Sequence, residues 1–184
     1  MYFLGIDQSL RSTGVAVLSQ EKVEYTGTVT PKKLTGVSRL AFIRDALWEI
    51  LVRFPNVSFA ALEGYAYDVG AGRVFELGEA GGMVQLVLHD SVIPFVVVPP
   101  ASLKQFVSGN GASDKEAMSA AVFSKWKIKI KQNDECDAFG LAQVAKAMYL
   151  NKGSTRAELE VLKSLRDKEK SISLVSYGKS VISI

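Results

Sequence analysis

Four acidic residues stand where apolar runs end or share one turn of a helix, and solvated surface acids are not normally found in such places. They are Asp7, Glu63, Asp134 and Asp137. A carboxylate at the edge of an apolar core needs a partner, and neighbouring carboxylates repel one another unless a cation lies between them. The pattern therefore indicates a divalent metal site, and with it a metal-dependent phosphoryl-transfer enzyme.

The spacing of apolar residues predicts an α/β fold that opens with strands. Apolar, β-branched runs predict strands over 2–7, 14–18 and 23–29, and the short connections between them predict an antiparallel arrangement. The other predicted elements are helices over 36–54, 73–88, 102–107 and 132–150, and strands over 59–63 and 92–98. Ser113 is predicted to cap a further helix, with Glu116 at the third position of a capping box.

The predicted elements bring the four acids toward one place. Asp134 and Asp137 are three residues apart on a helix, so they face the same way. Asp7 and Glu63 end strands, and strand ends at one edge of a sheet are where site residues of α/β folds gather. Two Mg²⁺ ions roughly 4 Å apart, held by such oxygens, activate a water and stabilise the leaving oxygen of a phosphodiester. We therefore expect hydrolysis of a nucleic acid backbone.

Each acid taken alone also has a structural explanation. Asp134 lies near a helix N-terminus, where the helix dipole favours an acid. Asp7 could cap the turn that follows it, and Glu63 could be a paired core acid. It is the joint pattern that favours a metal site.

Composition and charge narrow the class of protein. The chain has 184 residues, enough for one domain with a real core, and its only cysteine, Cys136, excludes an internal disulfide. The N-terminal residues lack the basic flank of a signal peptide, and no run of about 18 apolar residues predicts a membrane span. Residues 1–100 carry a net charge of −2 and residues 101–184 one of +5. A basic surface around a metal-neutralised acidic pocket suits a polyanionic substrate. The single cysteine indicates a reducing compartment, so we expect a cytoplasmic location.

A row of lysines precedes the last aspartates. It consists of Lys125, Lys127, Lys129 and Lys131, which alternate with apolar residues. The alternation predicts cations on one side of an extended segment. Such a run is usually a solvated face, but beside a nuclease site it can track a DNA arm.

At this point the chain resembles the RuvC family of Holliday junction resolvases, within the RNase H-like superfamily, over about residues 1–150. The resemblance lies in the opening hairpin around Gly5–Ser9 and Thr13–Val17, the second acidic site Ala61–Glu63, the glycine-bearing helix Phe75–Gly82, the closing aspartate pair, and the segment Leu103–Lys115. The last segment has the two lysines of the family, Lys104 and Lys115, at their usual separation.

The resemblance implies a mixed five-stranded sheet, with its first three strands antiparallel and helices on both faces. It also implies a homodimer that binds a four-way DNA junction and nicks two strands symmetrically, with two Mg²⁺ per active site or Mn²⁺ in their place. Asp7, Glu63, Asp134 and Asp137 would be the metal ligands and catalytic acids. Lys104 and Lys115 would assist catalysis and contact DNA. Four further residues depart from the family pattern but could also bind DNA: Tyr65 or Tyr67 by stacking on a base, and Lys125 and Lys127 through phosphates. The location expected for such a protein is a bacterial cell or a phage-infected host cell. The nuclease domain is expected to span 1–153, with 154–184 as a C-terminal appendage.

Other functions remain open on the sequence. The same site could cut flaps or replication forks, and a junction-binding protein without catalysis would keep the DNA surface but not need the full set of acids. Gly5-Ile6-Asp7 followed by a glycine-containing hairpin also opens the sugar-kinase and chaperone-type ATPase folds. Those folds need a second, duplicated domain, which 184 residues cannot supply.

Overall fold

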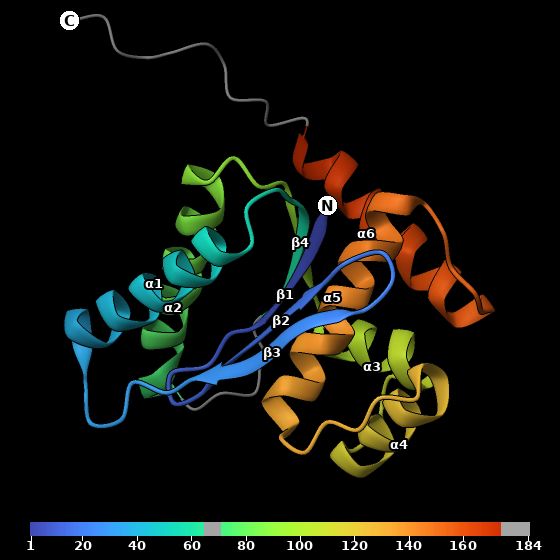
Figure 1. The fold of residues 1–184 in the computed structure, drawn as a ribbon, viewed down its shortest axis with the longest axis horizontal. Helices are drawn as coiled ribbons and strands as arrows, with labels where there is room; N and C mark the ends of the chain where they lie inside the picture. The colour runs from blue at the N-terminus through green and yellow to red at the C-terminus, as the bar shows by residue number, and fades with distance from the viewer. Residues whose placement is uncertain (65–70, 174–184) are drawn as a thin grey trace, which may run out of the picture.

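A mixed sheet with the strand order β3-β2-β1-β4-β5 forms the centre of the molecule. The computed structural model describes residues 1–64 and 71–173 (Figure 1). Its elements are β1 (Tyr2–Asp7), β2 (Thr13–Leu18), β3 (Val23–Val29), α1 (Gly36–Arg53), β4 (Val57–Glu63), α2 (Ala71–Asp90), β5 (Phe95–Val98), α3 (Pro100–Ser108), α4 (Lys115–Trp126), α5 (Asn133–Leu150) and α6 (Arg156–Ser173).

The strand pairing puts the ends of β1 and β4 at the same edge of the sheet. β1 pairs antiparallel with β2 and parallel with β4, and β2 pairs antiparallel with β3. β4 and β5 are parallel, with Glu63 opposite Val98. The prediction of a five-stranded mixed sheet with three antiparallel opening strands is confirmed. β5 is shorter than the expected 92–98, because Val92 has φ 56° and belongs to the turn that follows α2.

Helices cover both faces of the sheet, as Figure 1 shows, with α1 and α2 on one side and α5 on the other. Leu4 and Ile6 of β1 belong to the apolar cluster that includes the buried side chains of α1 and α2. Phe3 belongs to the cluster built around α5, α3, α4 and α6. Because successive side chains of a strand point to opposite faces, Asp7 falls on the same face as Phe3, the face that α5 covers.

The backbone of α5 lies directly on the first two strands, because glycines there leave room for it. A Cβ at Gly5 would overlap the carbonyl oxygen of Ala138 and the amide nitrogen of Ala142. A Cβ at Gly14 would overlap the carbonyl oxygen of Asp134. This close contact places the first turn of α5, with its two aspartates, next to the end of β1.

The helix α4 begins one residue later than the sequence predicts. Asp114, and not Ser113, is its N-cap, and its Oδ1 accepts a hydrogen bond of 2.8 Å from the N–H of Ala117. Ser113 is buried instead, and its hydroxyl lies 2.8 Å from that of Ser108 in the loop between α3 and α4. The predicted capping box was wrong because the loop already uses the Ser113 hydroxyl.

The helix α6 packs onto the rest of the fold. Val161, Leu162 and Leu165 are buried in the same apolar cluster as α3 and α5. The domain boundary at residue 153 stays a prediction. These three side chains pack α6 against residues that come before that boundary in the sequence. None of the helices among the described residues is long and apolar enough to cross a lipid bilayer.

Candidate active site

Asp7 and Glu63 meet at the carboxyl ends of β1 and β4. Asp7 is only 7% exposed, and its carboxyl group is hydrogen-bonded to that of Glu63. The side chain of Gln8 braces the same corner, since its Nε2 donates to the carbonyl oxygen of Glu63 at 2.7 Å. No pattern in the sequence indicated Gln8, because its partner lies on another strand and is a main-chain atom.

The two aspartates of α5 complete an acidic cluster. Burial, together with repulsion from Glu63, Asp137 and Asp134, raises the pKa of Asp7 to about 9. Burial and the same kind of repulsion, from Glu63 and Asp134, raise the pKa of Asp137 to about 6. The pKa of Glu63 is also raised by burial, although its hydrogen bond with Asp7 opposes the shift. Four carboxylates from three elements thus act on one another electrostatically, and Asp7 is the member that holds a proton.

The donor set of this cluster suits a hard divalent cation. All four side chains offer carboxylate oxygens, the ligands that Mg²⁺ and Mn²⁺ prefer. Their mutual repulsion is the condition that a bound cation relieves. Among the side chains that the structure describes, no three acidic, histidine or cysteine side chains stand close enough together, as placed, to hold a metal ion. A cation would therefore complete the arrangement by replacing the proton that Asp7 and Glu63 share.

Two lysines flank the acids from the side of α3 and α4. Lys104 of α3 and Lys115, the first residue of α4, line a cleft of about 100 Å³ together with Asp137. Both ammonium groups lower the pKa of Asp137, and that of Lys104 also lowers the pKa of Glu63. The structure therefore places Lys104 and Lys115 beside Asp137, and Lys104 also near Glu63.

The lysine row before α5 is only partly as expected. α4 continues to Trp126, so the segment is not extended at Lys125, whose ammonium lies 2.6 Å from Glu158. Lys127 follows the helix with φ 58°, and its Nζ donates to the carbonyl oxygen of Ser124 at 2.8 Å. The exposed members from there on are Lys127, Lys129 and Lys131. Ile128 and Ile130 pack against the core between them. Tyr65 and Tyr67 lie outside the described residues.

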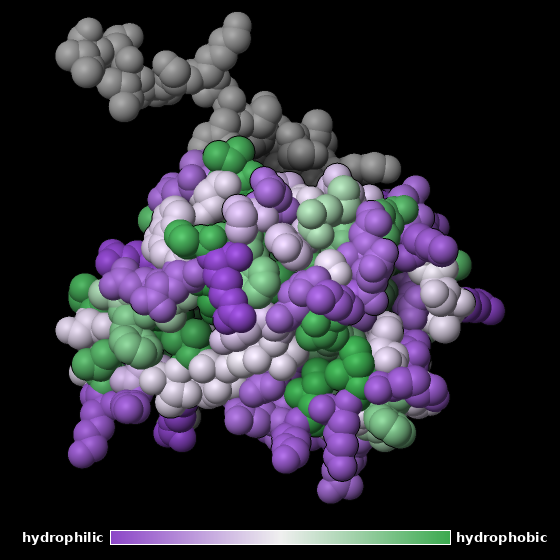
Figure 2. Space-filling view, in the orientation of Figure 1, coloured by the Kyte–Doolittle hydropathy of each residue, from purple (hydrophilic) through white to green (hydrophobic). Residues whose placement is uncertain are grey.

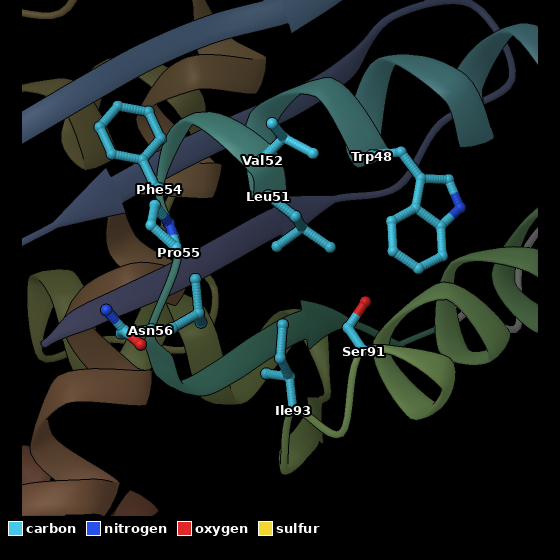
Figure 3. Close-up of a pocket in the computed structure, with 9 residues that line it drawn as sticks. Trp48, Leu51, Val52, Phe54, Pro55, Asn56, Ser91 and Ile93 are labelled. Atoms are coloured by element: carbon cyan, nitrogen blue, oxygen red, sulfur yellow. The ribbon is translucent and has the colours of Figure 1, made fainter.

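An apolar groove of about 400 Å³ lies at the other end of the sheet (Figure 3). It is lined by Trp48, Leu51 and Phe54 from the end of α1 and by Ile93 before β5, among others. The N–H of Tyr2, at the start of β1, bonds to Asn56 beside this groove, whereas Asp7 ends the same strand. The groove and the acidic cluster are therefore separate features.

Comparison with known proteins places the chain among nucleases. The family model of the crossover junction endodeoxyribonuclease RuvC matches residues 3–145. Proteins of that name from Colwellia psychrerythraea and Vibrio atlanticus are each 32% identical over 146 residues, which covers 76% of this chain and 83% of each relative.

Solved structures show the same fold. A structure of Thermus thermophilus RuvC aligns with a TM-score of 0.67 and 22% identity, covering 77% of this chain and 91% of that one. A second structure, of T. thermophilus RuvC in complex with Holliday junction substrate, aligns with a TM-score of 0.69 and 18% identity, covering 93% and 97%. The predicted RNase H-like fold is thereby confirmed.

Proposed function

Because the chain belongs to the RuvC family of crossover junction endodeoxyribonucleases, we propose that it resolves four-way DNA junctions by paired, symmetric nicks. The observation that carries the proposal is the buried cluster of Asp7, Glu63, Asp134 and Asp137, with two lysines beside it. Such a cluster holds divalent cations where a phosphodiester of a polyanionic substrate can approach them.

The acids hold the metal, for which we assign two Mg²⁺ with Mn²⁺ as a substitute. Asp7, Glu63, Asp134 and Asp137 would hold these ions, because the other three acids already act on Asp7 at one place. When bound, such a pair supplies an activated water and stabilises the leaving oxygen. Gln8 holds the main chain of Glu63 in place while the charges around it change.

The lysines act on the phosphate. Lys104 and Lys115 reach the cluster from α3 and α4, and each weakens the proton affinity of Asp137. An ammonium group in this position stabilises charge that develops on the phosphoryl oxygens. It also offers a contact to the scissile or adjacent phosphate.

The exposed lysine row extends the DNA surface. Ile128 and Ile130 are anchored on the core, so the lysines on either side of them point to solvent. Exposed cations that follow one another along such a connection can contact neighbouring phosphates of a DNA backbone. Figure 2 shows hydrophilic side chains projecting around this connection between α4 and α5. We propose that Lys127, Lys129 and Lys131 contact one arm of the DNA junction. Lys125 is not included, because its ammonium group faces Glu158.

The face of α2 that points away from the sheet supports a homodimer. Val84, Val87 and Leu88 face the core, while Phe75 is 79% and Leu86 59% exposed. Gly82 lies on the exposed stripe, and a Cβ there would meet no atom within 4 Å. Glycines inside a helix suggest close approach of another backbone. A second copy of the chain supplies that backbone, and a dimer provides the two sites that paired nicks require.

Cleavage of labelled DNA tests the function. A synthetic four-way junction, a linear duplex and a flap are incubated with the protein, with and without Mg²⁺. We expect symmetric nicks in the junction, and Asp7→Asn should reduce the rate by about a thousandfold or more while junction binding is retained. Asp45→Asn is the matched control, because Asp45 is an exposed acid on α1, and it should cleave normally.

Each other outcome has a clear meaning. Equal cutting of linear duplex would overturn the resolvase assignment and leave a general nuclease. Preferential cutting of the flap would favour the branched-DNA endonuclease. Junction binding with no Mg²⁺-dependent nicks would favour a non-catalytic binding protein.

A further inference from the structure

Three helices meet at a partly buried ion pair on the outer side of the lysine-bearing helices. Lys125 lies in the last turn of α4 and Glu158 in the first turn of α6, and their Nζ and Oε1 atoms are 2.6 Å apart. The two side chains are 28% and 7% exposed. The same ammonium donates to the carbonyl oxygen of Phe106 in α3 at 2.8 Å, and it lies 5.1 Å from the ring centroid of Trp126.

Glu158 is fixed by the start of its own helix. Its second carboxylate oxygen accepts the N–H of Ser154 at 2.6 Å, and its own N–H donates to the hydroxyl of Thr155 at 3.2 Å. This resembles a capping box, except that the carboxylate bonds to the residue before Thr155 and not to Thr155 itself. Val161 and Leu162 lie one turn further along α6 and are buried in the core. The carboxylate that faces Lys125 is therefore held by both its backbone and its helix.

Lys125 in turn holds the end of α3. The last carbonyl groups of a helix have no hydrogen-bond donor within that helix. An ammonium group there donates to such a carbonyl and also interacts favourably with the helix dipole. Phe106 is two residues from Lys104. The carbonyl oxygen of Lys104 itself accepts a hydrogen bond of 2.7 Å from Ser108, whose hydroxyl also meets Ser113 just before α4. The connection between α3 and α4 is thus pinned at the loop by serines and at the far end of α4 by Lys125.

We propose that Lys125 and Glu158 are positioning residues that hold α3 and α4 at the angle that puts Lys104 and Lys115 against the acidic cluster. The inference rests on the proposed function, because it gives those two lysines their task. It also assigns a role to α6, which lies beyond the family-matched residues 3–145. An ion pair that is partly out of water contributes little net stability, because desolvation offsets the attraction of the charges. The pair at this junction is therefore best explained by the geometry it imposes.

The central variant is the double substitution Lys125→Met with Glu158→Gln, which leaves no lone charge buried. At saturating junction and Mg²⁺, kcat should fall about 10- to 100-fold, the effect of a misplaced charged group at a reacting phosphate, with little change in KM. The decisive comparison is the same double substitution in a Lys104→Ala, Lys115→Ala background. There we expect a further loss of less than about twofold, because groups that act as one unit are not additive.

Two controls separate positioning from folding. Arg156→Gln breaks an exposed ion pair with Glu160 on the same helix, with Arg156 93% exposed, and it should leave kcat unchanged. Hydrogen exchange of the amides in 104–108 should speed up in the double variant, while exchange in α1 stays the same. If the double variant does not fold, Glu158→Gln alone takes its place, since its amide oxygen still accepts from Ser154.

Two results would overturn the inference. One is a folded double variant with the wild-type kcat. The other is an equal loss of kcat with and without Lys104 and Lys115, which would mean a general loss of folded protein. If the wild-type chain does not cut junctions, the proposed function fails first, and hydrogen exchange alone then decides whether the ion pair holds α3.

Discussion

Asp7 has the pKa that is raised furthest by burial and by neighbouring carboxylates. It is buried beside three carboxylates, and its pKa of about 9 means that it stays protonated at neutral pH when no cation is bound. An unfolded chain would release that proton near its ordinary pKa of 3.8. A raised folded-state pKa contributes stability below about pH 4, and this contribution is lost as the pH rises toward about 9. The residue most useful for catalysis therefore weakens the metal-free fold under the conditions in which it works.

Asp7→Asn should stabilise the metal-free protein, because an amide needs no proton to remain neutral when buried. At pH 8 and in EDTA we expect a gain on the order of 1–3 kcal/mol in the free energy of unfolding, measured by urea denaturation. The gain should shrink toward pH 4, where the wild-type carboxyl is neutral in both states. Saturating Mg²⁺ should stabilise the wild-type protein and not the variant. A variant that is less stable than the wild type at pH 8 would contradict this account.

At the scale of elements, the contact of α5 with β1 decides whether the site exists. Asp134 and Asp137 reach Asp7 only because α5 rests its backbone on the glycines of β1 and β2. The sequence predicts the strand, the helix and the face that the aspartates share. It does not predict the contact, because a glycine in a strand has several explanations until its neighbour across the interface is known.

Gly5→Ala should push α5 away from the sheet, since the added methyl group would overlap the backbone of Ala138 and Ala142. Overpacking of this kind costs about 1–3 kcal/mol of unfolding free energy, which denaturant titration measures. Junction cleavage should fall by more than the unfolded fraction explains, because Asp134 and Asp137 move with the helix. An unchanged midpoint together with full activity would show that α5 does not depend on Gly5 for its position.

At the scale of the whole molecule, the exposed apolar stripe of α2 is the proposed contact between two copies of the chain. The stripe through Phe75, Gly82 and Leu86 lies on the side of the helix away from the sheet. Two copies joined there would present two acidic clusters to one branched DNA. The exposed apolar side chains of this face would be covered only in an assembly of two chains, and the lysine row before α5 would be neutralised only by bound DNA.

Leu86→Glu should dissociate the dimer, because a charge at the interface would be buried without a partner. Sedimentation should change from dimer to monomer, and junctions should receive single, unpaired nicks at a lower rate. Leu159→Glu is the matched control, since Leu159 is 54% exposed on α6, across the sheet from α2, and it should remain a dimer. A wild-type chain that sediments as a monomer would refute the proposed interface.

Much of the local structure of this molecule follows from its sequence. Predictions for site residues succeed where a residue's position follows from the periodicity of its own strand or helix. Asp7, Glu63, Asp134 and Asp137 were predicted to converge because strand ends and helix faces follow from periodicity. Lys104 and Lys115 were predicted from a family resemblance and lie beside the acids. Lys125 was assigned to DNA because it alternates with apolar residues, yet α4 extends through it and turns its ammonium toward Glu158.

The sequence by itself determined the strands and helices, the antiparallel opening and the edge where the acids meet, and its resemblance to a known family supplied the mixed sheet. Only the tertiary structure decided that α5 lies on Gly5, that Asp114 and not Ser113 caps α4, and that α6 supplies the anion for Lys125. The physical reason is the distance along the chain over which each interaction acts. Periodicity fixes which face of an element is apolar, whereas a hydrogen bond or ion pair between distant residues depends on packing angles that the whole core sets together.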